Sequence, residues 1–354
     1  MHCSFVPPYL LRRLALLEDR SFLPVAEAAQ RALGRDALIR RRRNVSCARL
    51  AELPGIPPST GSGGTGLHPT RQINDAQHQE RLPGVRVRTE DEAEVQDPAV
   101  NEAYDGLGHT FDLYAQAYGR NSLDGAGEIL RATVHYGEDY DNAFWNGTRM
   151  VFGDGDGRIF QRFTKSLSVV GHELTHGVMQ HTANLVYQGQ PGALNESVSD
   201  VFAALVEQHR LGQTAEEADW LIGAGLFTDE VNGTALRSMK APGTAYDDDV
   251  IGKDPQPATM AGYVDTRSDN GGVHLNSGIP NHAFYRLAVQ LGGKAWERAG
   301  QIWYDTITGT LLSPDSGFAA FAEATAAAAE SRYGKESEEL KAVTAAWTEV
   351  GVLE

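Results

Sequence analysis

The chain has 354 residues, of which 41% are hydrophobic and 22% are charged, so it is long enough for a large core and for two or three domains. Its formal net charge of −16 argues against nucleic acid as the main partner, and its two cysteines exclude a disulfide scaffold. No apolar run approaches the roughly 18 residues of a membrane-spanning helix, so we expect no membrane partner.

The first 50 residues differ in charge from the rest of the chain. They hold 10 Lys/Arg and 4 Asp/Glu, a net charge of +6, which leaves −22 for the remaining residues. Either these are two solvated surfaces, or the basic head docks on the acidic body by charge complementarity. The leucine spacing after Pro7-Pro8 predicts a short amphipathic helix, and no secretory signal segment is recognisable.

A stretch rich in Gly, Ser and Pro follows the head. Residues 53–69 gain little from burial, and we interpret residues 51–70 as a flexible linker between the head and everything from about residue 71 onward. Both cysteines, Cys3 and Cys47, fall on the head side of this linker.

The body changes character near residue 165. Before it, residues 85–88 and 130–136 alternate like strands, and residues 98–118 have helical spacing after a capping Asp97 and Pro98. Helical patterns then dominate, over 166–181, 193–211, 278–291, 295–311 and 316–331. A β-rich lobe over 71–165 and a helical lobe over 166–354 predict an α+β protein with a cleft between the lobes.

The strongest chemical signal is a pair of histidines in the helical pattern 166–181. His172 and His176 are four positions apart, so both imidazoles lie on one helix face and can bind one ion, while Glu173 lies beside that ion. Glu196, in a second helical pattern twenty positions beyond His176, is suited to be the third ligand. Two imidazoles and one carboxylate leave an open position, as in a catalytic zinc site.

Two further carboxylates are placed to orient histidines. Asp200 lies one turn beyond Glu196 and is suited to hold the second nitrogen of a ligand histidine; the alternative is a helix-surface carboxylate. Asp269 precedes Asn270-Gly271-Gly272, a sequence that permits a tight turn back to His274. Such a pair is often only a satisfied polar contact, but beside a zinc site it is suited to stabilise a developing oxyanion.

These segments together resemble the thermolysin family of zinc endopeptidases, and further stretches agree in family order, namely 121–125, 133–136, 142–147, 150–157, 185–188 and 236–239. The short head with Pro7-Pro8 resembles the propeptide of the protealysin-like subgroup. The resemblance implies a thermolysin-like two-lobe metalloprotease, made as a self-inhibited precursor whose head is a propeptide over 1–50 and whose linker over 51–70 contains the activation cleavage.

The resemblance also implies the mechanism. Zn²⁺ would be bound by His172, His176 and Glu196, and Glu173 would be the general base for a zinc-activated water. Tyr187 and His274 would donate to the oxyanion, with His274 oriented by Asp269. Substrate would be held by Asn142, the Ala143 backbone and Arg237. A preference for a bulky hydrophobic residue after the scissile bond would come from a pocket of residues otherwise taken as plain core, namely Phe160, Phe163, Val169 and Leu236.

The sequence departs from thermolysin at a calcium site. Ser168 stands where thermolysin carries a calcium-binding aspartate, and Glu207 alone is a poor cage, so we expect Ca²⁺ dependence to be weak or absent. Asp154 and Asp156 are interpreted as turn caps. The thiolate of Cys3 is a candidate zinc ligand that blocks the open position in the precursor; the alternatives are a buried free thiol and a Cys3–Cys47 pair.

The leading hypothesis is therefore an active zinc endopeptidase that acts on proteins or peptides as a monomer. A non-catalytic peptide-binding protein is the first alternative, but Glu173, Tyr187 and His274 are all retained. Another zinc hydrolase, such as an amidase, is disfavoured because Asn142 and Arg237 would address a peptide backbone. The resemblance favours secretion, with a cytoplasmic precursor or an unconventional export route as alternatives.

Overall fold

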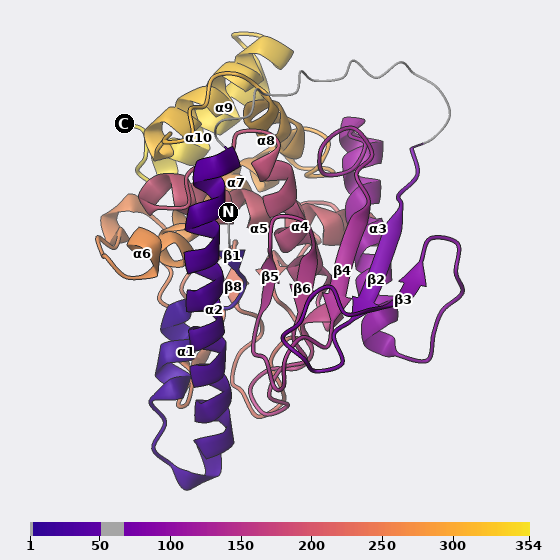
Figure 1. Ribbon diagram of the computed structural model, residues 1–354. Helices are drawn as coiled ribbons and strands as arrows, with labels where there is room; N and C mark the ends of the chain where they lie inside the picture. Colours follow the sequence, from indigo (N-terminus) through magenta and orange to yellow (C-terminus); the bar gives the residue numbers. More distant parts are fainter. Residues whose placement is uncertain (1–2, 51–66) are drawn as a thin grey trace. The chain divides into compact units, whose positions relative to one another are not determined.

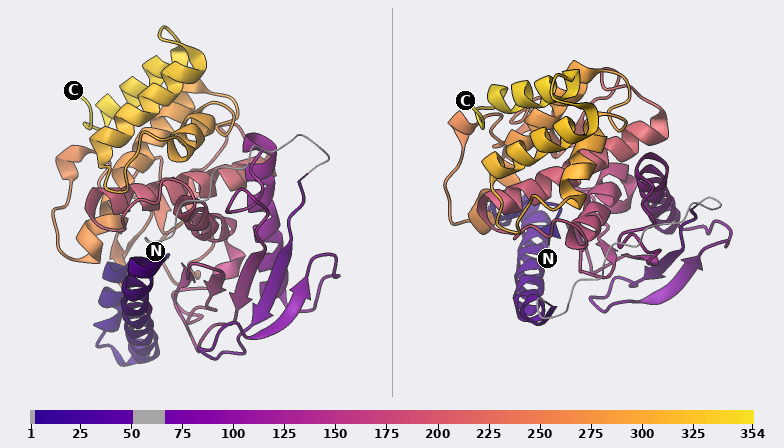
Figure 2. Two further views of the ribbon diagram at one scale, coloured as in Figure 1. Left: turned by 45° about the horizontal axis from the view of Figure 1, so that its top comes forward. Right: turned by 90° about the horizontal axis from the view of Figure 1, so that it is seen from above.

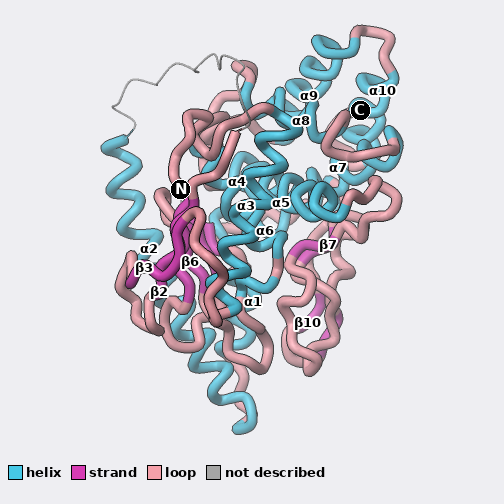
Figure 3. The backbone as a smooth tube through the Cα atoms, turned by 90° about the vertical axis from the view of Figure 1, so that its right-hand side faces the viewer, coloured by secondary structure: helices cyan, strands magenta, loops and turns pink. Residues whose placement is uncertain are grey.

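The computed structural model describes the backbone of residues 3–50 and 67–354, and the side chains of residues 4–36 and 67–354. Most of the predicted linker over 51–70 therefore lies outside the described residues. The chain divides into two compact units, residues 1–165 and residues 166–354 (Figure 1). The first unit contains the main sheet and the second is mainly helical (Figure 3), which confirms the predicted α+β fold.

The first unit is built on a six-stranded sheet in the order β1-β5-β6-β4-β2-β3. Neighbours β2 and β4 run parallel, as do β4 and β6, whereas the other pairs are antiparallel. Because β2, β4 and β6 share one direction, their carboxyl ends meet at one edge of the sheet. The strands are β1 (Cys3–Ser4), β2 (Arg71–Asp75), β3 (Val85–Thr89), β4 (Leu130–Val134), β5 (Ala143–Trp145) and β6 (Met150–Phe152).

The helix α3 (Pro98–Tyr118) packs on this sheet against β2 and β4. Its predicted start is confirmed, because the Asp97 carboxylate accepts the backbone N–H of Ala99 at 2.9 Å and Pro98 occupies the first turn. Its C-terminus is closed by Gly119 in the left-handed conformation. Both ends therefore follow directly from local sequence chemistry.

The described part of the head belongs to the first unit. The predicted amphipathic helix is present as α1 (Pro8–Ala15), and it packs against α2 (Leu23–Leu50), a much longer helix that was not predicted from the sequence (Figures 1 and 2). Strand β1 pairs antiparallel with β5, with Ser4 opposite Phe144. The head thus contributes the edge strand of the body's own sheet.

The second unit packs its helices around the pair α4 (Leu167–Gln180) and α5 (Gly189–Leu211). These two helices approach closely at Gly171, where an added Cβ would lie 3.2 Å from the Cα of Ala203. The remaining helices of this unit are α6 (Asp269–Asn276), α7 (Gly278–Leu291), α8 (Ala299–Thr308), α9 (Phe318–Tyr333) and α10 (Glu338–Glu349). Short antiparallel pairs join β7 (Leu221–Ile222) to β8 (Arg237–Ser238), and β9 (Asp247–Asp248) to β10 (Gly252–Lys253).

An aromatic cluster fills the core between α7 and the last three helices. The rings of Trp303 and Trp347 stack with their centroids 5.9 Å apart, and Phe284 and Phe321 pack on them edge-on. Helices α9 and α10 lie side by side (Figure 2). Among the helices of the described ranges, none combines the length and the apolar character that crossing a bilayer requires.

Candidate metal centre and active site

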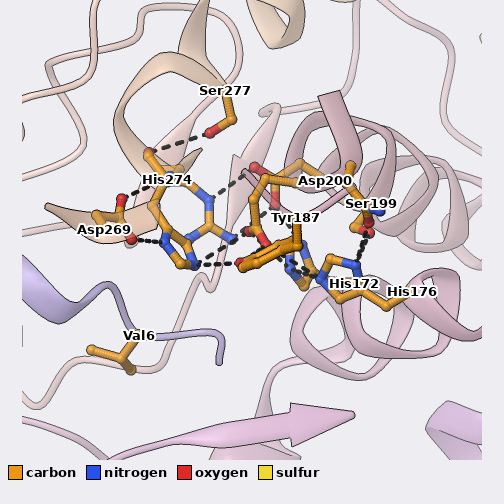
Figure 4. Close-up of polar contacts among 12 residues, drawn as sticks. Val6, His172, His176, Tyr187, Ser199, Asp200, Asp269, His274 and Ser277 are labelled. Carbon is orange, nitrogen blue, oxygen red and sulfur yellow. Dashed lines mark hydrogen bonds and ion pairs between the residues drawn. The ribbon is translucent and has the colours of Figure 1, made fainter. Parts of the chain in front are cut away.

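Two neighbouring helices of the second unit bring the three predicted ligands together (Figure 4). His172 and His176 project from α4 and Glu196 from α5, and all three side chains are buried. The two Nε2 atoms lie 3.0 Å apart, and the Glu196 carboxylate lies 3.4 Å from one Nε2 and 3.5 Å from the other. A tetrahedral ion with bonds of about 2.1 Å separates its ligand atoms by about 3.4 Å, so this donor set fits zinc.

Each ligand imidazole is fixed through its Nδ1 atom. Asp200 Oδ1 lies 2.7 Å from Nδ1 of His172, whereas Asn195 Oδ1 and Ser199 Oγ lie 2.8 and 3.0 Å from Nδ1 of His176 (Figure 4). An Nδ1–H group donated to these oxygens leaves the Nε2 lone pair of each ring directed at the common point. The surroundings of both imidazoles therefore select the tautomer that binds metal.

The Asp200 carboxylate is itself held by two buried donors. Arg237 donates from Nε and Nη2 at 2.8 Å each, and Asn281 donates from Nδ2 at 2.8 Å. Burial alone would raise the pKa of Asp200, but the charges of Arg237 and His172 outweigh burial and lower it to about 2. Asp200 thus stays ionised behind His172, and Arg237 is anchored against it.

The charges of the site favour a cation where the three ligand atoms meet. Burial opposes a charged imidazole, but Asp200 and Glu196 outweigh it and raise the pKa of His172 to about 9. Burial and the neighbouring His172 charge instead lower the pKa of His176 to about 3. His172 and His176 together therefore retain one extra proton near neutral pH, and a bound metal cation would replace that proton.

Tyr187, His274 and Asp269 form a connected group (Figure 4), and both Tyr187 and His274 lie next to Glu196. The predicted turn is present: Asp269, Asn270, Gly271 and Gly272 all have left-handed backbone angles, with φ between 49° and 82°. The turn brings the Asp269 carboxylate to the backbone N–H of His274 at 2.9 Å and to its Nδ1 at 2.7 Å. Tyr187 donates its hydroxyl to Glu196, and that hydroxyl lies 3.3 Å from Nε2 of His274.

The electrostatics keep the His274 ring a donor. Burial alone would lower the pKa of His274, but the carboxylates of Asp269 and Glu196 outweigh it and raise the pKa. The Tyr187 hydroxyl and the His274 ring both lie next to Glu196. They therefore present two polar hydrogens beside the candidate metal position.

Two of the residues predicted to hold the substrate, Asn142 and Ala143, make backbone contacts with the head. In the first unit, the Val6 N–H donates to Asn142 Oδ1 at 2.8 Å, and the Phe5 N–H donates to the Ala143 carbonyl at 3.0 Å. These contacts continue the β1–β5 pairing beyond β1 itself. The head therefore makes the backbone contacts that the sequence assigned to a substrate strand.

A third head residue, Asp36 of α2, reinforces this contact and was not identified from the sequence. It is buried and accepts hydrogen bonds from the Tyr140 hydroxyl at 2.6 Å and from Asn142 Nδ2 at 3.0 Å. Asp36 is the only carboxylate between residues 28 and 50 of the sequence, a segment that is otherwise basic. This isolated acidic residue was the one available signal for its role.

The four residues predicted to form the hydrophobic pocket are all buried but belong to different units. Phe160 and Phe163 are in the first unit, with ring centroids 5.8 Å apart, while Val169 and Leu236 are in the second unit. The side chains of Cys3 and Cys47 lie outside the described residues, so zinc ligation by Cys3 stays a prediction.

The region around Ser168, where the sequence differs from the calcium site of thermolysin, is held together by direct hydrogen bonds. The Ser168 N–H donates to Glu207 Oε1 at 3.0 Å, and the Ser168 hydroxyl accepts the Gly223 N–H at 3.0 Å. Burial first, and then the nearby charge of Asp219, raise the pKa of Glu207 to about 7. Glu207 is therefore an acid that titrates near neutral pH inside the second unit.

Comparisons with known proteins identify relatives along nearly the whole chain. The thermolysin metallopeptidase catalytic-domain model matches residues 65–180, and the thermolysin metallopeptidase alpha-helical-domain model matches residues 183–352. An extracellular metalloprotease of Pectobacterium carotovorum subsp. carotovorum is 48% identical over 99% of this chain and 96% of its own length. Protease PrtS of Photorhabdus sp. (strain Az29) is 50% identical over 80% of this chain and 76% of its own length.

A solved structure extends the likeness to the head. The precursor of protealysin, a metalloproteinase from Serratia proteamaculans, is 50% identical and superposes with a TM-score of 0.87 over 99% of each chain. The coverage includes the residues before the linker as well as the body.

Replacing Glu207 by Gln tests the pH dependence of folding stability. Because the pKa of about 7 lies above the ordinary value of 4.5, folding favours the protonated acid. This contribution is complete below about pH 4.5 and is lost as pH rises through about 7. The amide resembles the protonated acid, so we expect Glu207→Gln to leave the free energy of unfolding unchanged near pH 4.5. At pH 8 it should raise that energy by on the order of 2 kcal/mol, measured by urea unfolding.

The matched control is Glu216→Gln, which removes an exposed carboxylate from the same unit and should change stability little at either pH. A Glu207→Gln variant whose stability advantage is the same at pH 4.5 and pH 8 would contradict the assigned titration.

Proposed function

This chain belongs to the thermolysin family of metallopeptidases, and from that premise we propose that it is a zinc-dependent endopeptidase made as a self-inhibited precursor. The observation that carries the proposal is the convergence of His172, His176 and Glu196 on one point, with both imidazoles oriented from behind. A donor set of this kind keeps a coordination position open for chemistry.

When bound, zinc supplies Lewis acidity that polarises the scissile carbonyl and acidifies a water molecule. Glu173 follows the ligand His172 in α4 and is fully buried, and we assign it the role of general base, which accepts the proton of the attacking water. The same carboxylic acid then returns the proton to the departing amine. Asp200 keeps His172 in its metal-binding tautomer throughout.

The developing negative charge on the carbonyl oxygen requires hydrogen-bond donors. We assign that role to Tyr187 and His274, since the hydroxyl of the first lies 3.3 Å from Nε2 of the second. Asp269 positions the His274 ring through Nδ1. Arg237, held by Asp200, is proposed to hydrogen-bond the substrate carbonyl beyond the scissile bond.

Substrate recognition is proposed to use the edge of β5. Asn142 and the Ala143 backbone would hold the peptide as an added strand, as they hold Val6 and Phe5 of the head here. A bulky hydrophobic side chain after the scissile bond is the proposed preference, supported by the apolar character of its candidate pocket residues, Phe160, Phe163, Val169 and Leu236. Calcium dependence is proposed to be weak or absent, and the active enzyme a monomer.

Latency is proposed to arise from the head as a propeptide over 1–50, released by cleavage within 51–70. Support comes from the β1–β5 pairing, the buried Asp36 and the charge contacts of α2, in which Arg31 and Arg35 pair with Asp139 and Glu80. The complementary charges of head and body favour docking. By analogy with the relative named extracellular, we propose that the enzyme acts outside the cell.

Self-processing distinguishes an enzyme from a peptide-binding protein of the same fold. We expect the purified precursor to lose its head on incubation, and 1,10-phenanthroline to prevent this by removing the metal. Glu173→Gln should slow processing by at least about 10²–10⁴-fold, because the general base is lost while the zinc ligands remain. Intact mass measurement follows the reaction, and metal analysis confirms that the variant still holds zinc. Processing of Glu173→Gln at the wild-type rate would refute the assignment.

The oxyanion role predicts a defect in turnover rather than in binding. We expect His274→Ala to lower kcat on a short peptide by about 10²–10³-fold with little change in KM, because its donor acts mainly in the transition state. The control His282→Ala removes a histidine whose Nδ1 lies 3.1 Å from the Ala258 carbonyl, and this variant should retain activity. A rise in KM at unchanged kcat would assign His274 to substrate binding instead.

Loss of the Asp36 carboxylate should weaken latency. Asp36→Ala leaves the Tyr140 hydroxyl and the Asn142 amide without this buried acceptor, at a cost of about 1–3 kcal/mol. We therefore expect roughly 10-fold or greater acceleration of head release, followed by intact mass and by cleavage of a small peptide. Glu27→Ala, which removes an exposed carboxylate from the same helix, is the control. Equal latency of the two variants would show that Asp36 does not hold the head.

A further inference from the structure

A second cluster of metal-binding side chains lies in the first unit, outside the residues used by the proposed mechanism. It consists of His78, His135 and Asp154, whose ligand atoms all lie within 4.8 Å of one another. His135 directly follows the carboxyl end of β4, and Asp154 and His78 lie two and three positions after the ends of β6 and β2. Because these three strands are parallel, the fold gathers the three side chains at one sheet edge.

The spacing of this cluster resembles that of the candidate zinc ligands. Nδ1 of His135 lies 2.9 Å from each Asp154 oxygen, and Nδ1 of His78 lies 3.4 Å from Oδ2 of Asp154. The corresponding distances among His172, His176 and Glu196 are 3.0 to 3.5 Å. Both sets are close to the roughly 3.4 Å that separates ligands of a tetrahedral ion.

The backbone holds His78 in place although its side chain is exposed. The His78 N–H donates to the His135 carbonyl at 2.9 Å, and the Gly137 N–H donates back to the Gln79 carbonyl at 3.2 Å. Both histidines adopt left-handed angles, with φ of 59° and 53°, which are unfavourable for residues with a side chain. Such angles persist only where the surroundings enforce them, so the two imidazoles are presented together by the fold.

Asp97 supplies the outer contact that metal-binding histidines commonly have. Its Oδ2 lies 2.8 Å from Nε2 of His135, while its Oδ1 caps α3 at Ala99. A carboxylate on the far nitrogen fixes the ring and increases the basicity of the nitrogen that faces the ion. His135 is thus held by a carboxylate on the nitrogen away from the candidate ion, as His172 is held by Asp200, although Asp97 contacts Nε2 and Asp200 contacts Nδ1.

We propose that His78, His135 and Asp154 form a second metal site, positioned by Asp97, that binds a divalent transition metal such as zinc. Two imidazoles and one carboxylate suit zinc and its neighbours, whereas calcium takes oxygen ligands almost exclusively. The half-exposed position makes the ion exchangeable with solvent. The ion would connect the loops after β2, β4 and β6 to the start of α3 and so stabilise the first unit.

The competing explanation is an ion-pair cluster with no metal. In that case a protonated His135 bridges Asp97 and Asp154, and the nearby Arg162, paired with Glu102, adds positive charge. A metal ion must then displace the proton on Nδ1 of His135, so binding is best measured at mildly alkaline pH. Counting bound metal separates the two explanations.

The test uses the full precursor carrying Glu173→Gln, which is expected not to process itself. After dialysis against micromolar zinc at pH 8 and brief washing, bound zinc is counted by elemental analysis. We expect His78→Ala to bind one zinc fewer per chain than its parent. Because His78 is exposed, the substitution should not prevent folding, and circular dichroism checks this. His68→Ala, which removes an exposed histidine outside the cluster, should match the parent.

Asp97→Asn supplies the second arm, since asparagine can still cap α3. We expect it to weaken binding of the additional zinc by about 10–100-fold, measured by calorimetry. Thermal unfolding gives an independent measurement: added zinc should raise the Tm of the parent more than that of His78→Ala. Equal zinc counts for the parent and His78→Ala would overturn the metal site, and unchanged affinity in Asp97→Asn would overturn the role of Asp97.

Discussion

The close packing of α4 against α5 is the constraint on which the active site depends. The two helices approach closely where Gly171 meets Ala203, and a side chain larger than hydrogen at Gly171 would press on the backbone of α5. This approach brings two imidazoles of α4 to a carboxylate of α5, and it places Asp200 directly behind His172. The buried carboxylates of Asp200 and Glu196 are tolerated there because each lies close to an oppositely charged or protonatable side chain, Arg237 or His172.

Local sequence chemistry predicted some elements well and others poorly, for identifiable reasons. The ranges 98–118 and 278–291 match α3 and α7 at both ends, and a capping aspartate with a following proline marks the first of them. The helix α2 was not predicted because its buried face consists mainly of alanines (Ala26, Ala28, Ala29 and Ala32), which give a weak periodic signal. Strand β1 is too short for any pattern.

The site shows the same division between local and long-range information. The spacing of His172 and His176 is a property of one helix turn, so their convergence was predictable, and Asn195 and Ser199 flank Glu196 in the same helix. Asn281, however, meets Asp200 across 81 residues, and Asp36 meets Asn142 across 106. Only the complete fold brings such pairs together, and one sequence without a structure does not show which distant residues will meet.

The antiparallel pairing of β1 with β5 has a consequence for how activation proceeds. If β5 binds substrate as proposed, the tethered head would compete with peptides for the same strand edge at the effective concentration of an attached segment, which is in the millimolar range for short flexible connections. Severing the tether changes none of the contacts themselves. It converts an intramolecular equilibrium into a bimolecular one, so occupancy of the edge after the cut depends on dilution and on destruction of the freed segment.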